Sequence, residues 1–101
     1  AGVLDERGEL RLDDGAVQAL RAGKSLLPVG VAEVDGAFRR GDVVTLVDTS
    51  ARELGRGLAE YSDEEARQLV GCQSEEIEER LGYRGSSVMV HRDDLVLFDH
   101  D

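Results

Sequence analysis

The tripeptide Gly23-Lys24-Ser25 comes closest to phosphate chemistry, because phosphate-binding loops end in a glycine, a lysine and a hydroxyl residue. Such a loop also needs a glycine five residues before this one, and Gln18 stands there. The residues before the tripeptide predict a helix, whereas a phosphate loop follows a strand. We therefore predict neither a nucleotide site nor any other cofactor-binding residue in this chain.

The histidines and the single cysteine are the residues that could ligate a metal ion or act as a nucleophile. His91 and His100 have no metal-ligand spacing to each other or to Cys72. We interpret both histidines as solvated side chains, and Cys72, which lies between two predicted helices, as a small buried residue. The sequence predicts no metal site.

Carboxylates cluster between Glu60 and Gly82, and paired carboxylates can act as acid and base when burial separates their pKa values. The glutamates concerned are Glu64, Glu65, Glu75, Glu76, Glu78 and Glu79. They crowd the first turns of predicted helices, where the helix dipole favours negative charge, and the opposite faces are apolar. A solvated face is the expected role, so we predict no catalytic residue.

The elements that position these residues begin with a strand at residues 9–12, where apolar and polar residues alternate. Asp13 suits a helix N-terminus and Gly23 a left-handed helix end, so we predict a helix over 13–22. Residues 25–34 are typical of a strand, but Pro28 cannot donate to a sheet ladder and requires an edge or a bulge there.

The central strands are predicted from two further apolar runs. Residues 43–47 have almost no polar break, so we expect a strand that is buried on both faces. Residues 53–60 predict another strand, in which Gly55 and Gly57 indicate a bulge or a close approach of two backbones.

The last third of the chain predicts two helices and a hairpin. Ser62 and Glu65 form a capping box before a helix over 63–70, and a second acidic helix covers 74–82. Apolar runs at 88–90 and 95–98 flank a polar tip, which predicts a hairpin that turns at Arg92-Asp93. Short strands with glycine-rich turns favour a small barrel or sandwich over a parallel sheet with crossover helices.

Length and composition fit one domain over residues 1–101. The chain has 101 residues, of which 41% are hydrophobic, enough for one core. A lone cysteine cannot form an internal disulfide, so we expect a cytoplasmic protein. No apolar run is long enough to cross a bilayer, and we expect no membrane partner.

The charge is strongly negative and unevenly distributed. The formal net charge is −10, and residues 60–82 contribute eight acidic and two basic side chains to it. Residues 1–42 carry eight acidic and six basic side chains. A polyanion is repelled by phosphate backbones, so composition argues against avid nucleic-acid binding.

Five stretches in this order and at this spacing carry a family resemblance. They are residues 23–31, 38–44, 56–62, 74–83 and 91–97. Together they resemble the PUA domain at the C-terminal end of bacterial glutamate 5-kinases, and the resemblance covers about residues 8–98. It implies a mixed α/β, mainly β fold: a pseudo-barrel of about six strands with short helices.

The resemblance also implies a parent enzyme. In such enzymes an N-terminal amino-acid-kinase domain transfers the ATP γ-phosphate to L-glutamate, giving L-glutamyl 5-phosphate for proline biosynthesis. That domain, with its ATP and magnesium sites, is absent from this chain. The kinase domain of the same protein is therefore the implied partner, and any oligomer would form through the parent enzyme.

RNA-modifying relatives of this family use the turn after the first helix to face RNA. The matching residues here are Gly23, Lys24, Ser25, Leu27, Pro28 and Gly30. Gly23 permits a close backbone approach, Lys24 offers one cation and Ser25 a hydroxyl. The same turn also serves simply as the helix end and strand start of the fold, and the net charge favours that role.

Three hypotheses follow for function. The first is a non-catalytic regulatory or interaction module of a metabolic kinase, and the second is an RNA-binding module with weak affinity. The third, a free-standing small enzyme, has no nucleophile–base pair or metal set to support it.

Overall fold

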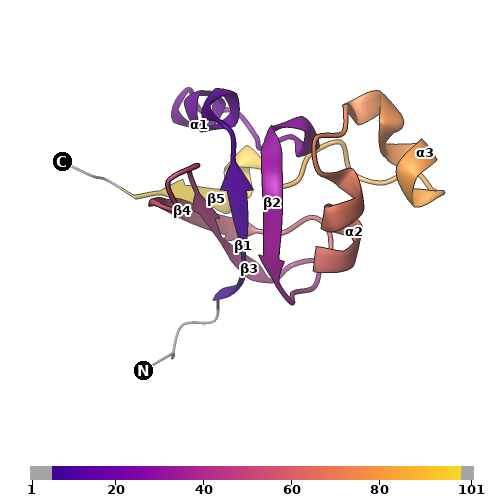
Figure 1. The fold of residues 1–101 in the computed structure, drawn as a ribbon, viewed down its shortest axis with the longest axis horizontal. Helices are drawn as coiled ribbons and strands as arrows, with labels where there is room; N and C mark the ends of the chain where they lie inside the picture. Colours follow the sequence, from indigo (N-terminus) through magenta and orange to yellow (C-terminus); the bar gives the residue numbers. More distant parts are fainter. Residues whose placement is uncertain (1–5, 99–101) are drawn as a thin grey trace.

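The computed structural model describes residues 6–98, which form one mixed sheet with short helices packed around it (Figure 1). The strands are β1 (Glu6–Leu12), β2 (Val31–Gly36), β3 (Val43–Val47), β4 (Glu53–Leu58) and β5 (Leu95–Leu97). The helices are α1 (Asp14–Arg21), α2 (Asp63–Leu69) and α3 (Ile77–Leu81), with 3₁₀ turns η1 (Pro28–Gly30), η2 (Ser74–Glu76) and η3 (Arg92–Asp94). The predicted mixed, mainly β fold is confirmed.

The sheet has the strand order β2-β1-β3-β4-β5. Strands β1 and β3 are parallel, and the other neighbouring pairs are antiparallel. Against the expected six strands, residues 6–98 have five in this sheet and one isolated bridge between Leu26 and Val90.

The centre of the sheet follows the sequence closely. In β3, Val44 and Leu46 are buried, and so are Thr45 and Val47 on the other face, as the apolar run predicts. A Cβ on Gly55 of β4 would come within 2.2 Å of the Val96 carbonyl oxygen, so β5 can pair this closely only with a glycine. The predicted close backbone approach is confirmed.

The helix boundaries also agree with the sequence. Ser62 and Glu65 form the predicted capping box of α2, with Ser62 Oγ accepting a hydrogen bond from the Glu65 N–H at 3.2 Å. The predicted helix over 74–82 divides into η2 and α3 and ends at Gly82, which has a left-handed φ of 84°.

Two sequence predictions are wrong. Residues 25–34 do not form one strand, because Pro28 starts the η1 turn and β2 begins only at Val31. Residues 88–90 and 95–98 do not form a hairpin either. His91 Nδ1 accepts a hydrogen bond from the Asp93 N–H, which starts η3 and redirects the chain. Val90 therefore bridges to Leu26, and β5 pairs with β4.

Candidate functional site

The turn that follows α1 holds the first residues with a predicted binding role. Gly23 has a φ of 86°, the left-handed conformation that favours glycine, and its N–H donates to the Leu20 carbonyl at 3.0 Å. The Lys24 N–H donates to the Ala19 carbonyl at 3.0 Å, which completes a Schellman ending. Gly23 is thus required by the helix end, and the ending presents Lys24 to solvent.

Ser25 and Leu26 join this turn to the C-terminal part of the chain. The Ser25 hydroxyl accepts a hydrogen bond from the Arg92 N–H at 2.9 Å. The Leu26 N–H donates to the Val90 carbonyl at 2.9 Å, and Leu26 itself is buried. The Ser25 hydroxyl, which we considered as a possible ligand contact, therefore already accepts a hydrogen bond from the main chain.

Pro28 and Gly30 lie in η1, which packs against α1 on one side and the end of α2 on the other. Pro28 is buried, and its carbonyl accepts a hydrogen bond from the Gly71 N–H at 3.1 Å. A Cβ on Gly30 would lie 2.5 Å from the Ala16 Cβ. The Gly30 carbonyl also accepts from the Asp13 N–H at 3.0 Å, so both residues hold η1 against its neighbours.

Between α1 and residues 24–30 lies an open hollow of about 360 Å³. From the predicted set, Lys24, Ser25, Leu27 and Gly30 line it, whereas Gly23 and Pro28 do not. Leu27 is 42% exposed and Val29 is 37% exposed, and these two side chains give the hollow an apolar mouth.

Sequence reasoning missed part of this lining. Val29 and the α1 residues Gly15, Ala16 and Ala19 also face the hollow. The available signal was the run of small residues on one side of α1, together with the two apolar residues that flank Pro28. Small residues on a helix are common for other reasons, so this signal was weak.

The charges around the hollow are few. Lys24 forms no ion pair with any residue in the range 6–98. Asp13 also lines the hollow, but its carboxylate accepts a hydrogen bond from the Ala16 N–H at 2.8 Å and caps α1. One solvated cation is therefore the only positive charge that lines the hollow in the described part of the chain.

Arg21 lines a different hollow with Leu20 and Leu54, and the next cations along the chain lie too far away to extend this charge. Arg39 and Arg40 are in the connection between β2 and β3, at the end of β2 opposite η1 (Figure 1). The six residues of β2 separate the two ends by about 17 Å. The cations of the first 42 residues thus do not form one patch at the hollow.

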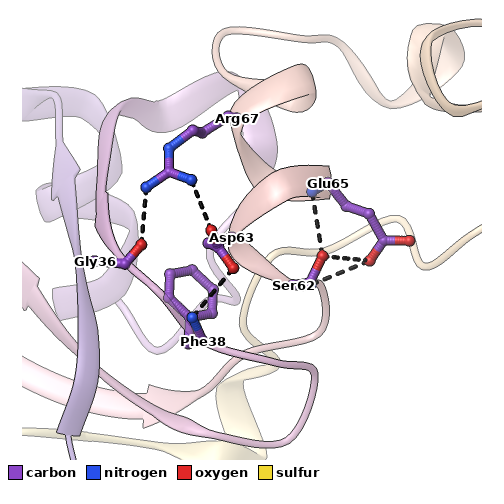
Figure 2. Close-up of polar contacts among 6 residues, drawn as sticks. All are labelled: Gly36, Phe38, Ser62, Asp63, Glu65 and Arg67. Atoms are coloured by element: carbon purple, nitrogen blue, oxygen red, sulfur yellow. Dashed lines mark hydrogen bonds and ion pairs between the residues drawn. The ribbon is translucent and has the colours of Figure 1, made fainter.

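A second polar region lies at the start of α2 (Figure 2). The Phe38 N–H donates to Asp63 Oδ1 at 3.1 Å, and the Asp63 N–H donates to the Phe38 carbonyl at 3.1 Å. Arg67 donates to Asp63 Oδ2 at 2.7 Å and to the Gly36 carbonyl at 2.8 Å. We call these four residues the α2 junction.

The electrostatics of the α2 junction favour a charged carboxylate. The hydrogen bond from the Phe38 N–H, followed by the bond from Arg67, lowers the pKa of Asp63 below its ordinary value. In Figure 2, the Asp63 carboxylate and the Arg67 guanidinium are both directed at other residues of the chain. The junction therefore holds α2 to the sheet and leaves little capacity for a ligand.

Cys72 and His91 are also used by the fold, whereas His100 lies outside the described residues. Cys72 is buried, as predicted, and burial raises the pKa of its thiol. His91 uses Nδ1 to cap η3. Within residues 6–98, no group of three or more histidine, cysteine, aspartate or glutamate side chains could hold a metal ion. No helix in that range is long and apolar enough to span a bilayer.

The family profile of the PUA domain matches residues 8–81. The chain is 58% identical over 97 residues to the glutamate 5-kinase of Rhizobium rhizogenes strain K84, and 57% identical to that of Rhizobium etli strain CIAT 652. These matches cover 96% of the chain but only 25% of each relative.

Solved structures share the fold. A PUA domain from Aeropyrum pernix K1, solved as a tartrate complex, superposes with a TM-score of 0.61 and 29% identity, covering 83% of this chain and 41% of that one. The archaeal box H/ACA sRNP Nop10-Cbf5 complex contains a chain with a TM-score of 0.57 and 22% identity, covering 86% of this chain and 26% of that one.

Proposed function

Because the chain belongs to the PUA domain family, we propose that it is the non-catalytic C-terminal domain of a glutamate 5-kinase and acts as a regulatory and interaction module. The observation that carries this proposal is the 97-residue match at 58% identity to a protein named glutamate 5-kinase. The match spans a quarter of that relative's length, so the remainder supplies room for a kinase domain.

The parent enzyme would transfer the ATP γ-phosphate to the side-chain carboxylate of L-glutamate, with magnesium, at the start of proline biosynthesis. Such a transfer needs groups that position a nucleotide and a nucleophile. In residues 6–98 the candidates are committed to the fold, since Asp63 binds the Phe38 N–H, His91 caps η3 and Cys72 is buried. The reaction then belongs to the kinase domain, in a cytoplasm that keeps Cys72 reduced.

An activity assay tests this proposal. The full-length protein, the kinase domain alone and the 101-residue chain alone are each given ATP, magnesium and L-glutamate, and the acyl phosphate is trapped with hydroxylamine. We expect product from the first two proteins and none from the chain alone. If the domain is regulatory, the activity of the full-length enzyme and that of the kinase domain alone should respond differently to added proline.

Two results would overturn the proposal. A full-length protein without glutamate kinase activity would remove the assignment of the parent. Turnover by the isolated chain above the rate of a buffer control would show that the chain itself carries catalytic groups.

RNA binding is the second candidate function, and one observation favours it. Lys24 and Ser25, which the family resemblance places toward RNA, line the hollow beside α1. Against it, the lining holds one cation in a molecule of net charge −10. We therefore rank weak, non-specific RNA contact below the protein-interaction role.

A further inference from the structure

Leu27 and Val29 form an exposed apolar surface. Five large apolar residues in the range 6–98 are strongly exposed, and these two share one hollow. Of the others, Tyr83 directs its hydroxyl to Glu65, whereas Leu58 and Val96 lie on the sheet strands β4 and β5. Exposed apolar side chains that line a concave surface are typical of a binding site.

The opposite wall of the hollow admits close contact. It consists of Gly15, Ala16 and Ala19, none of which extends beyond a methyl group. An apolar side chain that enters the hollow therefore reaches the backbone of α1 on one side and Leu27 and Val29 on the other. Such contact would remove apolar surface from water on both partners.

The hollow is also formed before anything binds. The Schellman ending fixes Gly23, the Asp13 N–H bonds the Gly30 carbonyl at 3.0 Å, and the Leu26–Val90 bridge anchors the middle of the segment. A surface that is already ordered avoids most of the entropy loss that binding otherwise imposes.

The charge of the hollow does not suit a polyanion. Among residues 6–98, Lys24 is the single cation in the lining, and Asp13 also lines the hollow. Phosphate groups gain affinity by replacing condensed counterions with protein cations, and one lysine offers little of this. The apolar character of the surface suits a polypeptide segment with aliphatic or aromatic side chains instead.

We propose that this hollow is the docking site for an apolar segment of the kinase domain of the same protein, an inference that rests on the proposed function. The occupant is indicated by the length of chain outside the matched region, since the chain covers 25% of its relatives. In the proposed parent protein, about three quarters of the polypeptide would then be tethered to this domain. Tethering supplies effective concentrations in the millimolar range for short linkers, so a small apolar contact is sufficient.

The geometry permits this contact. Strand β1, the first described element, leads to α1 (Figure 1). Its seven residues span about 20 Å, and the kinase domain of the proposed parent would precede it. A compact domain about three times the size of this chain has a radius of gyration of roughly 19 Å. Its surface therefore reaches the hollow from the linker.

Hydrogen exchange on the full-length protein tests the proposal. Exchange of peptides that cover residues 14–30 is compared between the full-length protein and the isolated chain, which has its own buried core. We expect at least tenfold slower exchange in the full-length protein. Leu27→Ser with Val29→Ser should abolish this difference, whereas Leu58→Ser with Val96→Ser, a matched pair of exposed apolar residues, should preserve it.

The controls separate the outcomes. Both double variants are first unfolded in urea as isolated chains, so that a loss of protection is not mistaken for unfolding. Equal exchange in full-length and isolated protein would overturn the proposal, as would protection that disappears on dilution, which indicates a second copy, or that requires added RNA. A full-length protein that shows the protection but lacks kinase activity would contradict the proposed function and not the docking surface.

Discussion

Helices α1 and α2 begin in the same way but face different surroundings. Each starts at a side-chain cap, Asp13 for the Ala16 N–H and Ser62 for the Glu65 N–H. Beyond its cap, α2 is tied to the β2–β3 connection by hydrogen bonds to Asp63 and Arg67 (Figure 2). Beyond its cap, α1 faces a hollow lined mostly by carbon.

The two regions differ in whether the fold itself uses their side chains or leaves them exposed to solvent. At the α2 junction, donors and acceptors meet one another, and a half-buried main-chain group without a partner would be costly. At the α1 hollow, the main-chain groups of Lys24, Leu26 and Gly30 bond other main-chain groups of the fold. The Leu27 and Val29 side chains and Lys24 remain exposed. The acidic side chain at the α2 junction therefore has a structural role. The α1 hollow, which has few charges, is the candidate interface.

The sharpest test compares two adjacent leucines in the isolated chain. Leu26 is 1% exposed and Leu27 is 42% exposed. We expect Leu26→Ala to lower the free energy of unfolding by about 2–5 kcal/mol, since it leaves a cavity in the core. Leu27→Ala should cost no more than about 1 kcal/mol. Urea denaturation followed by circular dichroism measures both, and equal losses would place the hollow's mouth in the core.

Two glycines that line the hollow should respond in opposite directions. Gly30→Ala places a Cβ 2.5 Å from the Ala16 Cβ, and such overpacking costs about 1–3 kcal/mol. Gly15→Ala adds a Cβ whose nearest neighbour is Asp13 Oδ1 at 3.6 Å, an ordinary contact. Because alanine favours a helix over glycine, it should stabilise the chain by up to about 1 kcal/mol. The urea midpoints of the two variants should thus move apart, and a shift of both in one direction would contradict this packing.

Local signals in the sequence predicted the caps and the buried strand well. The capping box at Ser62, the helix end at Gly23 and the burial of residues 44–47 each depend on residues that are close in the sequence. The hairpin at Arg92 was wrong because the partner of Val90 is Leu26, from a distant part of the sequence. Alternating apolar residues show that a strand exists but do not identify its neighbour.

The candidate site was only partly predictable for a similar reason. The Gly23–Gly30 turn was located by the family resemblance and by the helix end. The contributions of Val29, Ala16 and Ala19 depend on how η1 packs against α1, which no local pattern specifies. Asp63 was not singled out from the sequence, because its bond to the Phe38 N–H joins segments 25 residues apart.

Acid should weaken the α2 junction more than the α1 hollow. The pKa of Asp63 is lowered in the folded state, first by the Phe38 N–H and then by Arg67, relative to its ordinary value of 3.8. A lowered folded-state pKa gives stability that is present above pH 3.8 and is lost as the pH falls through the folded-state pKa. Asp63→Asn should therefore be less stable than wild type at pH 7, and the gap should narrow as the pH falls below 3.8.

Urea denaturation of both proteins from pH 7 down to pH 2.5 measures this gap. Asp48 also has a lowered pKa, chiefly because of its hydrogen bond from the Arg52 N–H, and it contributes to the acid sensitivity of both proteins alike. Only the difference between wild type and Asp63→Asn reports on the junction. A gap that stays constant over this range would show that the charge of Asp63 is not what holds α2.

The smallest expected effect concerns RNA at the α1 hollow. In the described part of the chain, Lys24 is the cation that lines it, whereas Arg21 lines a different hollow beside α1. Arg39 and Arg40 lie at the other end of β2. One phosphate contact would give a log–log salt slope of about one, so we expect a Kd no tighter than about 10⁻⁵ M at physiological salt. Lys24→Glu should reduce the slope by about one, and Arg39→Glu, the matched control, should leave it unchanged. A salt titration with a structured RNA measures both variants. Sub-micromolar binding that collapses with Lys24→Glu alone would make RNA the occupant of the hollow, because only a site centred on that lysine distinguishes the two cations.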